Sequence, residues 1–502
     1  MLSHQFKVSV GLLKFMSVLF IALPFYPFFL GWLRLEIGIV LSILLTVGLF
    51  FYAKTRNYKQ FQQISTLHFF GIFCIIFVFV AFSGTGGFGF QVADYLKQNV
   101  VTRDLMQQSW PISYQLEGKT VYLAHYLGYY ILGPTLVGHL GWGAVNLFNF
   151  GFTFLGFLIS SFWLCRFANN FKVSFGLFFV FFGGITSISF LILHGSNSVQ
   201  VLIETIKTNG HFFWLNAWDT IPLTYLGTSE QLRWSPQHTV PCGVLMGLLL
   251  NDWLIDDDIR YSPFYLSLLA LWSPLVLIGF APFLLIILIQ KGFHPILNST
   301  NFFIAPVIFF VVAMMLLSLE VGSFPSHFIL NYENTIGNDL SRKIGVYCWF
   351  LVMEVGVWWL PVYLILRKRL ASTENLVLIF TGILLSLIPL YRYGLWNDWC
   401  GRVSFPALFI LFAFVWKAFS ETTVRWQAVL IGILVMGSMT PLAQFAGSLR
   451  MSGYRIKINP PALTSLPTLR EICVGYSIDQ FVAKDNTFFY KYIAKIKKSN
   501  PK

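Results

Sequence analysis

The feature that most constrains this chain is the repeated return of apolar segments of about 20 residues. A helix rises about 1.5 Å per residue, so about 20 apolar residues match a hydrocarbon core about 30 Å thick. The 502 residues are 56% hydrophobic and only 11% charged, far below the roughly 25% charge of a soluble domain. Because alternating segments typical of membrane barrels do not recur, the sequence predicts an all-α polytopic integral membrane protein.

The positive charges of the chain indicate its orientation. The net charge is +13, but Lys and Arg lie mostly between the apolar segments, so nucleic acid is not an expected partner. Lys and Arg in short loops mark the cytoplasmic side, which predicts that the loops at Lys54, Arg166 and Arg367 and the N-terminus are cytoplasmic. Alternation then predicts about thirteen transmembrane helices, including two short crossings hinged at residues 272–274, where Pro274 interrupts the helix.

This topology predicts a transmembrane domain over residues 1–447 and a C-terminal tail over residues 448–502. Two long loops, about 85–142 and about 195–237, are predicted to be exoplasmic, and so is the tail. Long ordered loops frequently carry function. The polar residues of these loops are therefore the first candidates for a site.

The first exoplasmic loop begins with a concentration of charge. The glycines of residues 83–89, SGTGGFG, predict a tight turn where the chain leaves the bilayer. Residues 92–105, VADYLKQNVVTRDL, follow, and helical spacing puts Asp94 and Lys97 on one face, with Asp104 about three turns farther along. The pattern is typical of a solvated helix with an ion pair. It also fits a site in which Asp94 is a general base or a metal ligand.

Two further groups of polar residues lie beside predicted spans. The tyrosines of residues 122–130 fall at helical spacing, which predicts an amphipathic interfacial helix. Within it, Tyr126 belongs either to an aromatic belt or to a wall that binds sugar or lipid. Gln237 and His238 follow Pro236 at the start of a span. They are interpreted equally well as hydrogen-bonding residues or as substrate contacts.

The last two candidates are a charged loop and an isolated acid. The loop from Arg392 to Arg402 also contains Asp398, and its arginines either reach lipid phosphates or bind the phosphate of a lipid substrate. Glu354 lies near the middle of a predicted span, where a carboxylate is a functional candidate or a hydrogen-bonding partner of another helix.

Taken in order, these segments form a pattern that covers most of the chain. Its residues are Asp94, Lys97, Asn99, Arg103-Asp104-Leu105, Trp110-Pro111, Tyr126, Tyr129-Tyr130, Trp234-Ser235-Pro236-Gln237-His238, Trp272-Ser273-Pro274, Gly394, Asn397-Asp398, Arg402, Ser404-Phe405-Pro406 and Phe488-Phe489-Tyr490-Lys491-Tyr492. The pattern resembles the GT-C superfamily of polytopic glycosyltransferases, in particular a group of bacterial members.

The resemblance implies transfer of a sugar from a polyprenyl-phosphate donor to an exoplasmic glycan, lipid or protein acceptor, with inversion at the anomeric carbon. It implies that Asp94 is the catalytic base and that Arg402 or Arg392 contacts the donor phosphate. It also implies a bacterial inner membrane and contacts with membrane lipids. The expected substrate-binding residues are Lys97, Arg103, Asp104, Tyr126, Gln237, His238, Asp398, Arg392 and Arg402.

In one respect the chain departs from the family pattern. Many members have adjacent acids in the first exoplasmic loop, whereas Asp94 is followed by no other acid until Asp104. No metal ligand is therefore assigned, and a divalent cation is left open as a cofactor.

Two other functions stay open. A transporter or flippase of a lipid-linked sugar would carry binding charges near the midplane on broken helices in paired repeats, and no internal repeat is visible in this sequence. A non-catalytic scaffold protein would need no polar cavity at the level of Asp94.

Overall fold

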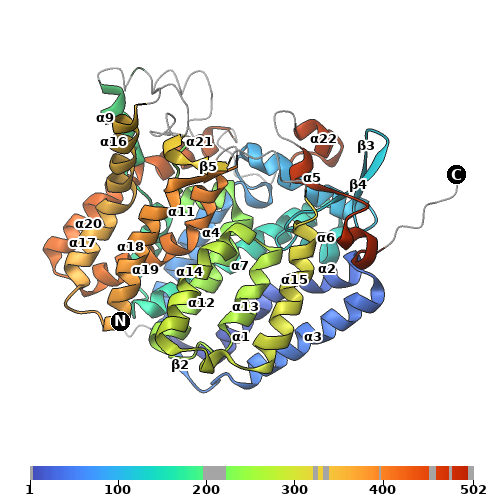
Figure 1. Ribbon diagram of the computed structural model, residues 1–502. Coiled ribbons are helices and arrows are strands. Elements are labelled where there is room, and N and C mark those ends of the chain that lie inside the picture. Colours follow the sequence, from blue (N-terminus) through green and yellow to red (C-terminus); the bar gives the residue numbers. More distant parts are fainter. Residues whose placement is uncertain are drawn as a thin grey trace.

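The computed structural model describes residues 4–195, 200, 222–319, 326–331, 339–394, 397–451, 460–473 and 478–495. Within these ranges the chain is mainly helical and its strands are short, as expected for an all-α protein. Figure 1 shows the helices packed side by side, with the small strands at the periphery.

Seven helices of the described chain are long and apolar enough to cross a membrane, or up to nine if each of two bent pairs is one span. The seven are Val10–Trp32, Leu35–Lys54, Trp142–Phe167, Pro236–Ile255, Pro274–Lys291, Leu340–Leu366 and Ser372–Leu390. The bent pairs join α8 (Ser174–Phe181) to α9 (Thr186–His194) and α20 (Val424–Gly437) to α21 (Met439–Met451). The predicted count of thirteen is therefore not confirmed. The long apolar helices are compatible with an integral membrane protein.

The outer and inner helices differ in how much of their surface is buried. In α3 (Leu35–Lys54) and α14 (Pro274–Lys291) only 33% and 28% of the most apolar window is buried. Large apolar side chains point outward from them, such as Phe50 at 61% and Ile289 at 74% exposure. In contrast, the span that begins with α12 (Pro236–Leu250) is 89% buried. It is therefore the central helix of the bundle.

Small residues let α12 pack closely on α7 (Trp142–Phe167). A Cβ atom on Gly156 would lie 2.5 Å from Val240 Cγ1, and one on Gly247 would lie 2.7 Å from Trp163 Cβ. Such contacts are too short for any side chain larger than hydrogen. Close approach through small residues is the usual way in which helices associate in lipid.

The break expected at residues 272–274 is present. The chain forms α13 (Ser262–Ser267) and the short helix η5 (Leu268–Leu271), and α14 then begins at Pro274 with Ser273 as its N-cap. The ten residues from Ser262 to Leu271 span only about 15 Å, so they reach about halfway through a bilayer. Of the two predicted crossings, only this one is short.

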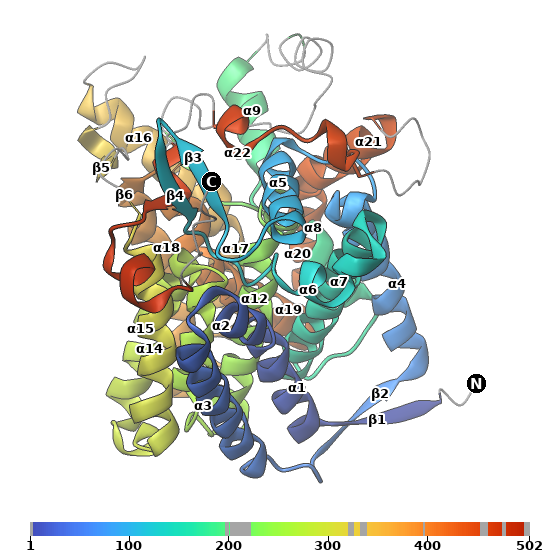
Figure 2. The ribbon, with the colours of Figure 1, turned by 90° about the vertical axis from the view of Figure 1, so that its right-hand side faces the viewer.

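The bundle has two distinct ends. At one end, β1 (Gln5–Ser9) pairs with β2 (Phe61–Ser65). At the other end lie α5 (Ala93–Gln107) and a sheet of β3 (Ser113–Leu116), β4 (Lys119–Leu123) and β7 (Val482–Lys484), in which β4 is central (Figures 1 and 2). We call them the β1 end and the α5 end. The tail thus lies at the same end as the first long loop.

The helix predicted over residues 122–130 is wrong. Tyr122 and Leu123 belong to β4, and residues 124–131 form an irregular loop. The strand forms because β4 pairs on both edges, with β3 and with β7 of the tail. That second partner lies far along the chain, so local periodicity does not reveal it.

The predicted glycine turn is confirmed. Between α4 (Thr66–Phe82) and α5, the glycines Gly84, Gly86 and Gly89 have φ values of 94°, 67° and 68°. Only glycine adopts this left-handed region without strain. The turn redirects the chain so that α5 begins directly above the bundle.

A buried ion network occupies the β1 end. Lys14 Nζ lies 2.5 Å from Asp252 and 2.8 Å from Asp256, and Arg166 lies 2.7 Å from Asp256. Two of the predicted cytoplasmic loops, those at Lys54 and Arg166, contribute Arg56 and Arg166 to it. The six members of this network are Lys14, Arg56, Arg166, Asp252, Asp256 and Asp258.

Candidate functional site

The α5 helix presents two charged side chains, Asp94 and Lys97. Asp94 lies in its first turn and Lys97 follows one turn later. Both are partly exposed, and within the described residues neither forms a hydrogen bond or an ion pair. The ion pair that the spacing allows is therefore not formed. The helix dipole favours negative charge at this position of α5.

Arg402 approaches from the opposite end of the sequence. It lies in a single π-helical turn, η12 (Trp399–Val403), and pairs with Asp398 one turn earlier. Burial disfavours the charge of Arg402, yet its pKa is raised because Asp398, Tyr126 and Asp94 outweigh that penalty. Arg402 and Asp94 are therefore close enough to interact electrostatically.

Lys97 is the second cation of this group. Burial acts to lower its pKa, but the nearby Asp94 and Tyr126 raise the pKa above its usual value. Its ammonium lies 5.6 Å from the ring centre of Phe481, which belongs to the tail. Lys97 is thus a permanent positive charge without a bonded counter-ion among the described residues.

The irregular loop after β4 dips into the bundle to complete the group. The amide of Gly128 donates to the carbonyl of Leu271 at 2.8 Å, directly beside the helix break. A Cβ atom on Gly128 would lie 2.7 Å from Trp272 Cγ, so only glycine permits this approach. The loop thereby places the ring of Tyr126 4.9 Å from that of His238.

Two buried imidazoles flank Tyr126. The rings of His125 and Tyr126 are 3.7 Å apart, and His238 Nδ1 lies 2.6 Å from Ser273 Oγ. The Nε2 atoms of both histidines are buried and have no hydrogen-bond partner in the described chain. Burial, with a smaller effect of Lys97, holds the pKa of His125 well below its usual value. His125 is therefore neutral at physiological pH.

We call this group the Asp94 cluster, and it lies at the α5 end of the central helices. Its members are Asp94, Lys97, His125, Tyr126, His238, Asp398 and Arg402. Gln237 lies at its edge, where its Oε1 is 3.5 Å from Nε2 of Gln98 on α5. Every member of the cluster except His125 was expected from the sequence. With Gln237, seven of the ten expected site residues thus come together.

The other three expected residues lie elsewhere. Arg103 bonds to Asp104 at 2.8 Å and to the carbonyls of Leu466 and Pro467 at 2.8 and 2.9 Å, while Tyr114 donates to Asp104. This arrangement fastens the tail to α5. Arg392 lies in β6 (Tyr391–Tyr393), opposite His327 of β5 (Ser326–Phe328).

Three residues near the site were not predicted as site residues. His125 was one residue of a tyrosine-rich stretch, and Phe481 has no local signal because its place depends on the pairing of β7 with β4. Ser273 had a signal, since the tripeptide Trp-Ser-Pro occurs twice, at 234–236 and at 272–274. Both copies start a helix beside the cluster.

The cluster does not fit a metal site. Among the described residues, no three His, Cys, Asp or Glu side chains lie together as a metal would require. The divalent cation left open by the sequence therefore has no ligand set in this part of the chain, and no step is assigned to it.

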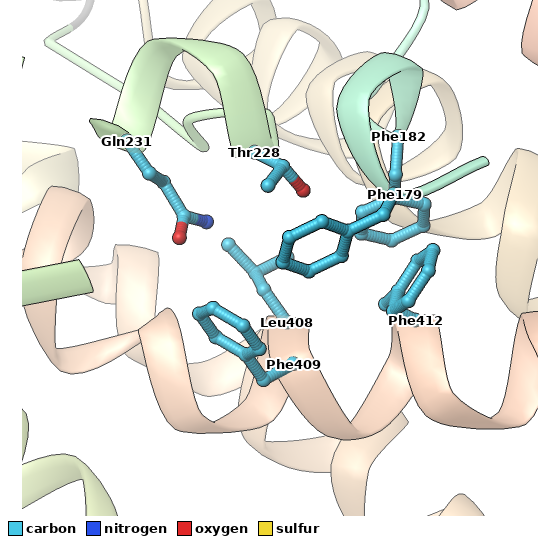
Figure 3. A pocket seen from close by; sticks show the side chains of 7 residues that line it. All are labelled: Phe179, Phe182, Thr228, Gln231, Leu408, Phe409 and Phe412. Carbon is cyan, nitrogen blue, oxygen red and sulfur yellow. The ribbon is translucent and has the colours of Figure 1, made fainter. Parts of the chain in front are cut away.

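A small cavity lies between α8, α11 (Thr228–Trp234) and α19 (Phe405–Glu421), as Figure 3 shows. Its volume is about 10 Å³, which is room for about one water molecule. Gln231 lines this space, and its Oε1 has no hydrogen-bond partner in the described chain. The cavity is too small for a sugar. Its lining residues are Phe179, Phe182, Thr228, Gln231, Leu408, Phe409 and Phe412.

Glu354 lies inside the span Leu340–Leu366 and is not a member of the Asp94 cluster. Its carboxylate accepts a 2.5 Å hydrogen bond from Thr186, at the bend between α8 and α9. A Cβ atom on Gly184 would lie 1.7 Å from Glu354 Oε2, so that glycine makes room for the acid. Glu354 therefore bonds another helix, one of the two roles expected from the sequence.

Comparisons of the chain with protein-family models, with curated proteins and with solved structures gave no match. The function is therefore argued from the site itself.

Proposed function

We propose that this protein is a membrane glycosyltransferase of the GT-C type, which transfers a sugar from a polyprenyl-phosphate donor to an exoplasmic acceptor. In this proposal the α5 end faces the exoplasm of a bacterial inner membrane, and the N-terminus is cytoplasmic. The acceptor is a glycan, lipid or protein.

The observation that carries the proposal is the convergence of one carboxylate and two cations from distant parts of the chain. Asp94 and Lys97 come from α5, and Arg402 comes from η12. Asp94 and Lys97 have no bonded partner among the described residues. Half-buried charges without a partner are costly to a folded protein. Their presence is explained if a ligand supplies the missing partners.

The chemistry follows from these groups. An acceptor oxygen attacks the anomeric carbon, and Asp94 takes its proton as general base. A carbon–oxygen bond forms to the acceptor while the bond between the anomeric carbon and the phosphate oxygen breaks, and its electron pair stays on that oxygen. Lys97 and Arg402 stabilise the negative charge that develops there. The products are the glycosylated acceptor and a polyprenyl phosphate.

The charge balance favours a donor with one phosphate. Asp398 is already paired with Arg402, and Asp94 is reserved as the base, so Lys97 is the one cation without a bonded counter-ion in the described cluster. A polyprenyl-phosphate sugar is a phosphodiester with a single negative charge. A diphosphate would bring a second charge that these residues do not balance.

A flippase of a lipid-linked sugar is the second candidate. The observation that favours it is the bent pair α8–α9 with Glu354 at the bend, because broken helices with midplane acids are typical of transporters. It does not account for the unpaired Asp94 and Lys97 at the α5 end.

The test compares the wild-type protein with Asp94→Asn and with a control, Asp485→Asn, whose side chain is exposed in the tail. Each purified protein is incubated with a panel of radiolabelled polyprenyl-phosphate sugars and with extracted cell-envelope acceptors. We expect the wild type and Asp485→Asn to release sugar from a donor, and Asp94→Asn to be at least about 10³-fold slower. Equal rates in all three proteins would refute the role of Asp94. If the wild type instead moves the intact lipid across a vesicle membrane without releasing sugar, the flippase is correct.

A further inference from the structure

The buried Nε2 atom of His238 shows how this expected substrate-binding residue would make its contact. Its side chain is 2% exposed, and Nε2 has no partner in the described chain. Buried polar groups in folded proteins are almost always hydrogen-bonded, so an unpaired one indicates a missing partner. The surroundings of the ring indicate which partner that is.

The hydrogen bonds of Ser273 favour one tautomer of His238. Ser273 caps α14, and its oxygen accepts from the amide of Val276 at 3.3 Å. Its hydroxyl hydrogen is then available to His238 Nδ1, 2.6 Å away. When Nδ1 accepts this bond, the neutral imidazole carries its hydrogen on Nε2. Nε2 is then a donor, and the missing partner is an acceptor.

The charges around the ring favour an anionic acceptor. Lys97 and Arg402 are the two cations within electrostatic range of His238, and His125 is the other imidazole nearby. Tyr126 packs between the two imidazoles and connects them to the rest of the Asp94 cluster. A neutral N–H donor beside two cations is a favourable surrounding for a phosphate oxygen.

We propose that His238 is a substrate-contacting residue, whose Nε2–H donates a hydrogen bond to the same lipid phosphate that Lys97 and Arg402 bind. Ser273 is a positioning residue that holds the ring in the required tautomer. This inference rests on the proposed function, because it assigns a further contact to the phosphate of that donor. It adds a donor without adding charge, which suits a singly charged phosphate.

The helix break explains why Ser273 is in reach. In a continuous helix through residues 262–291, the hydroxyl of Ser273 would donate to a backbone carbonyl of its own helix. The hydroxyl of Ser267 does this with the carbonyl of Phe264. Because η5 ends at Leu271 and α14 begins at Pro274, Ser273 is instead a cap whose side chain points outward. The break thus places a hydroxyl beside the start of α12.

The test uses two replacements of His238 that differ only in reach. The amide nitrogen of glutamine occupies about the position of Nε2, whereas asparagine reaches only to the position of Nδ1. The full-length variants His238→Gln and His238→Asn are purified, and binding of farnesyl phosphate is measured by isothermal calorimetry. We expect Kd to rise about tenfold or more for His238→Asn, as for loss of a hydrogen bond to a charged group, and less than about threefold for His238→Gln.

Ser273 is tested in parallel, with controls for loss of a histidine and loss of a helix cap. Ser273→Ala is expected to weaken binding about threefold to tenfold, and Ser273→Thr, which keeps the hydroxyl, to restore it. His139→Gln changes an exposed histidine, and Ser9→Ala removes the cap of α1 (Val10–Ala22) at the β1 end. Neither control should change Kd.

The outcomes separate this inference from the proposed function. Equal Kd values for the wild type, His238→Asn and His238→Gln would overturn the inference, even if the wild type transfers sugar. Weaker binding by His238→Asn alone would support the inference, even if no sugar is released. In that case His238 would contact the phosphate of a lipid that a flippase carries. Competition by excess inorganic phosphate that is as strong as competition by farnesyl phosphate would show that the ligand is free phosphate and not a lipid.

Discussion

The two ends of the bundle both concentrate charge, but they differ in how completely that charge is paired. At the β1 end, each member of the ion network lies within 3.2 Å of an opposite charge. At the α5 end, Arg402 pairs with Asp398 and Arg103 with Asp104, but Asp94 and Lys97 have no such partner among the described residues. Paired buried charges hold the folded structure together, whereas unpaired charges are available to bind a ligand. The two ends should therefore respond differently to the same kind of substitution.

The largest expected effect is on stability at the β1 end. Asp256→Asn would leave Lys14 and Arg166 buried without the carboxylate that they share. Breaking a buried pair in this way costs about 3–5 kcal/mol of unfolding free energy. We expect a large fall in Tm in detergent, measured by the change in tryptophan fluorescence on heating. Asp257→Asn is the control, because that side chain is 70% exposed and pairs only with Lys291. A similar Tm for both variants would contradict the structural role of the network.

The next effect is on activity at the α5 end. Lys97→Gln removes the unpaired cation of the Asp94 cluster without breaking any bond in the described chain. We expect kcat/KM for sugar transfer to fall about 100-fold, while Tm is unchanged within about 1 °C. Lys119→Gln, which changes an exposed lysine in β4, should leave both values unchanged. A fall in Tm with unchanged kcat/KM would show that both ends of the bundle are structural.

A third prediction distinguishes the two arginines that the sequence could not separate. Arg402 belongs to the Asp94 cluster, whereas Arg392 pairs through β6 with the strand of His327. We expect Arg402→Gln to lower kcat/KM about tenfold or more, and Arg392→Gln to lower it less than about threefold. The reverse order, measured in the same transfer assay, would place the phosphate beside β6.

The smallest effect concerns pH. Burial opposes the charges of Asp256 and Asp258, but Arg166 and Lys14 lower the pKa of Asp256, and Arg260 and Arg56 lower that of Asp258, below the usual 3.8. A depressed pKa contributes stability that is present above the usual value and is lost as the pH falls through the folded value. We expect Tm to decline below about pH 4. Asp258→Asn should reduce this decline, and an unchanged acid profile in that variant would contradict the assignment.

Much of the helical architecture could be predicted from the sequence, because apolar length and helix-breaking residues act locally. The glycines of residues 83–89 and Pro274 produced the turn and the break that their chemistry predicts. The number of spans was not predictable in the same way. Ser262–Leu271 is apolar but too short to cross alone, and α8–α9 bends within one apolar block.

The site was predictable only in part, for a related physical reason. Concentrated charge beside a span indicated Asp94, Lys97 and Arg402, because such charge is costly at a bilayer edge. The same signal also indicated Arg103, which instead fastens the tail through two backbone carbonyls. Charge density shows that a residue needs a partner, but only the fold shows whether that partner is the protein or a ligand.

The pairing of β7 with β4 has a consequence for the order in which the protein matures. Phe481 stands over Lys97, and Ala124 donates to the carbonyl of Phe481 at 2.8 Å, so residues 478–495 form part of the wall around the site. The ribosome makes these residues after every helix of the bundle. Until residues 478–495 are made, the wall around the Asp94 cluster is incomplete. The candidate site is therefore complete only when synthesis has passed this segment.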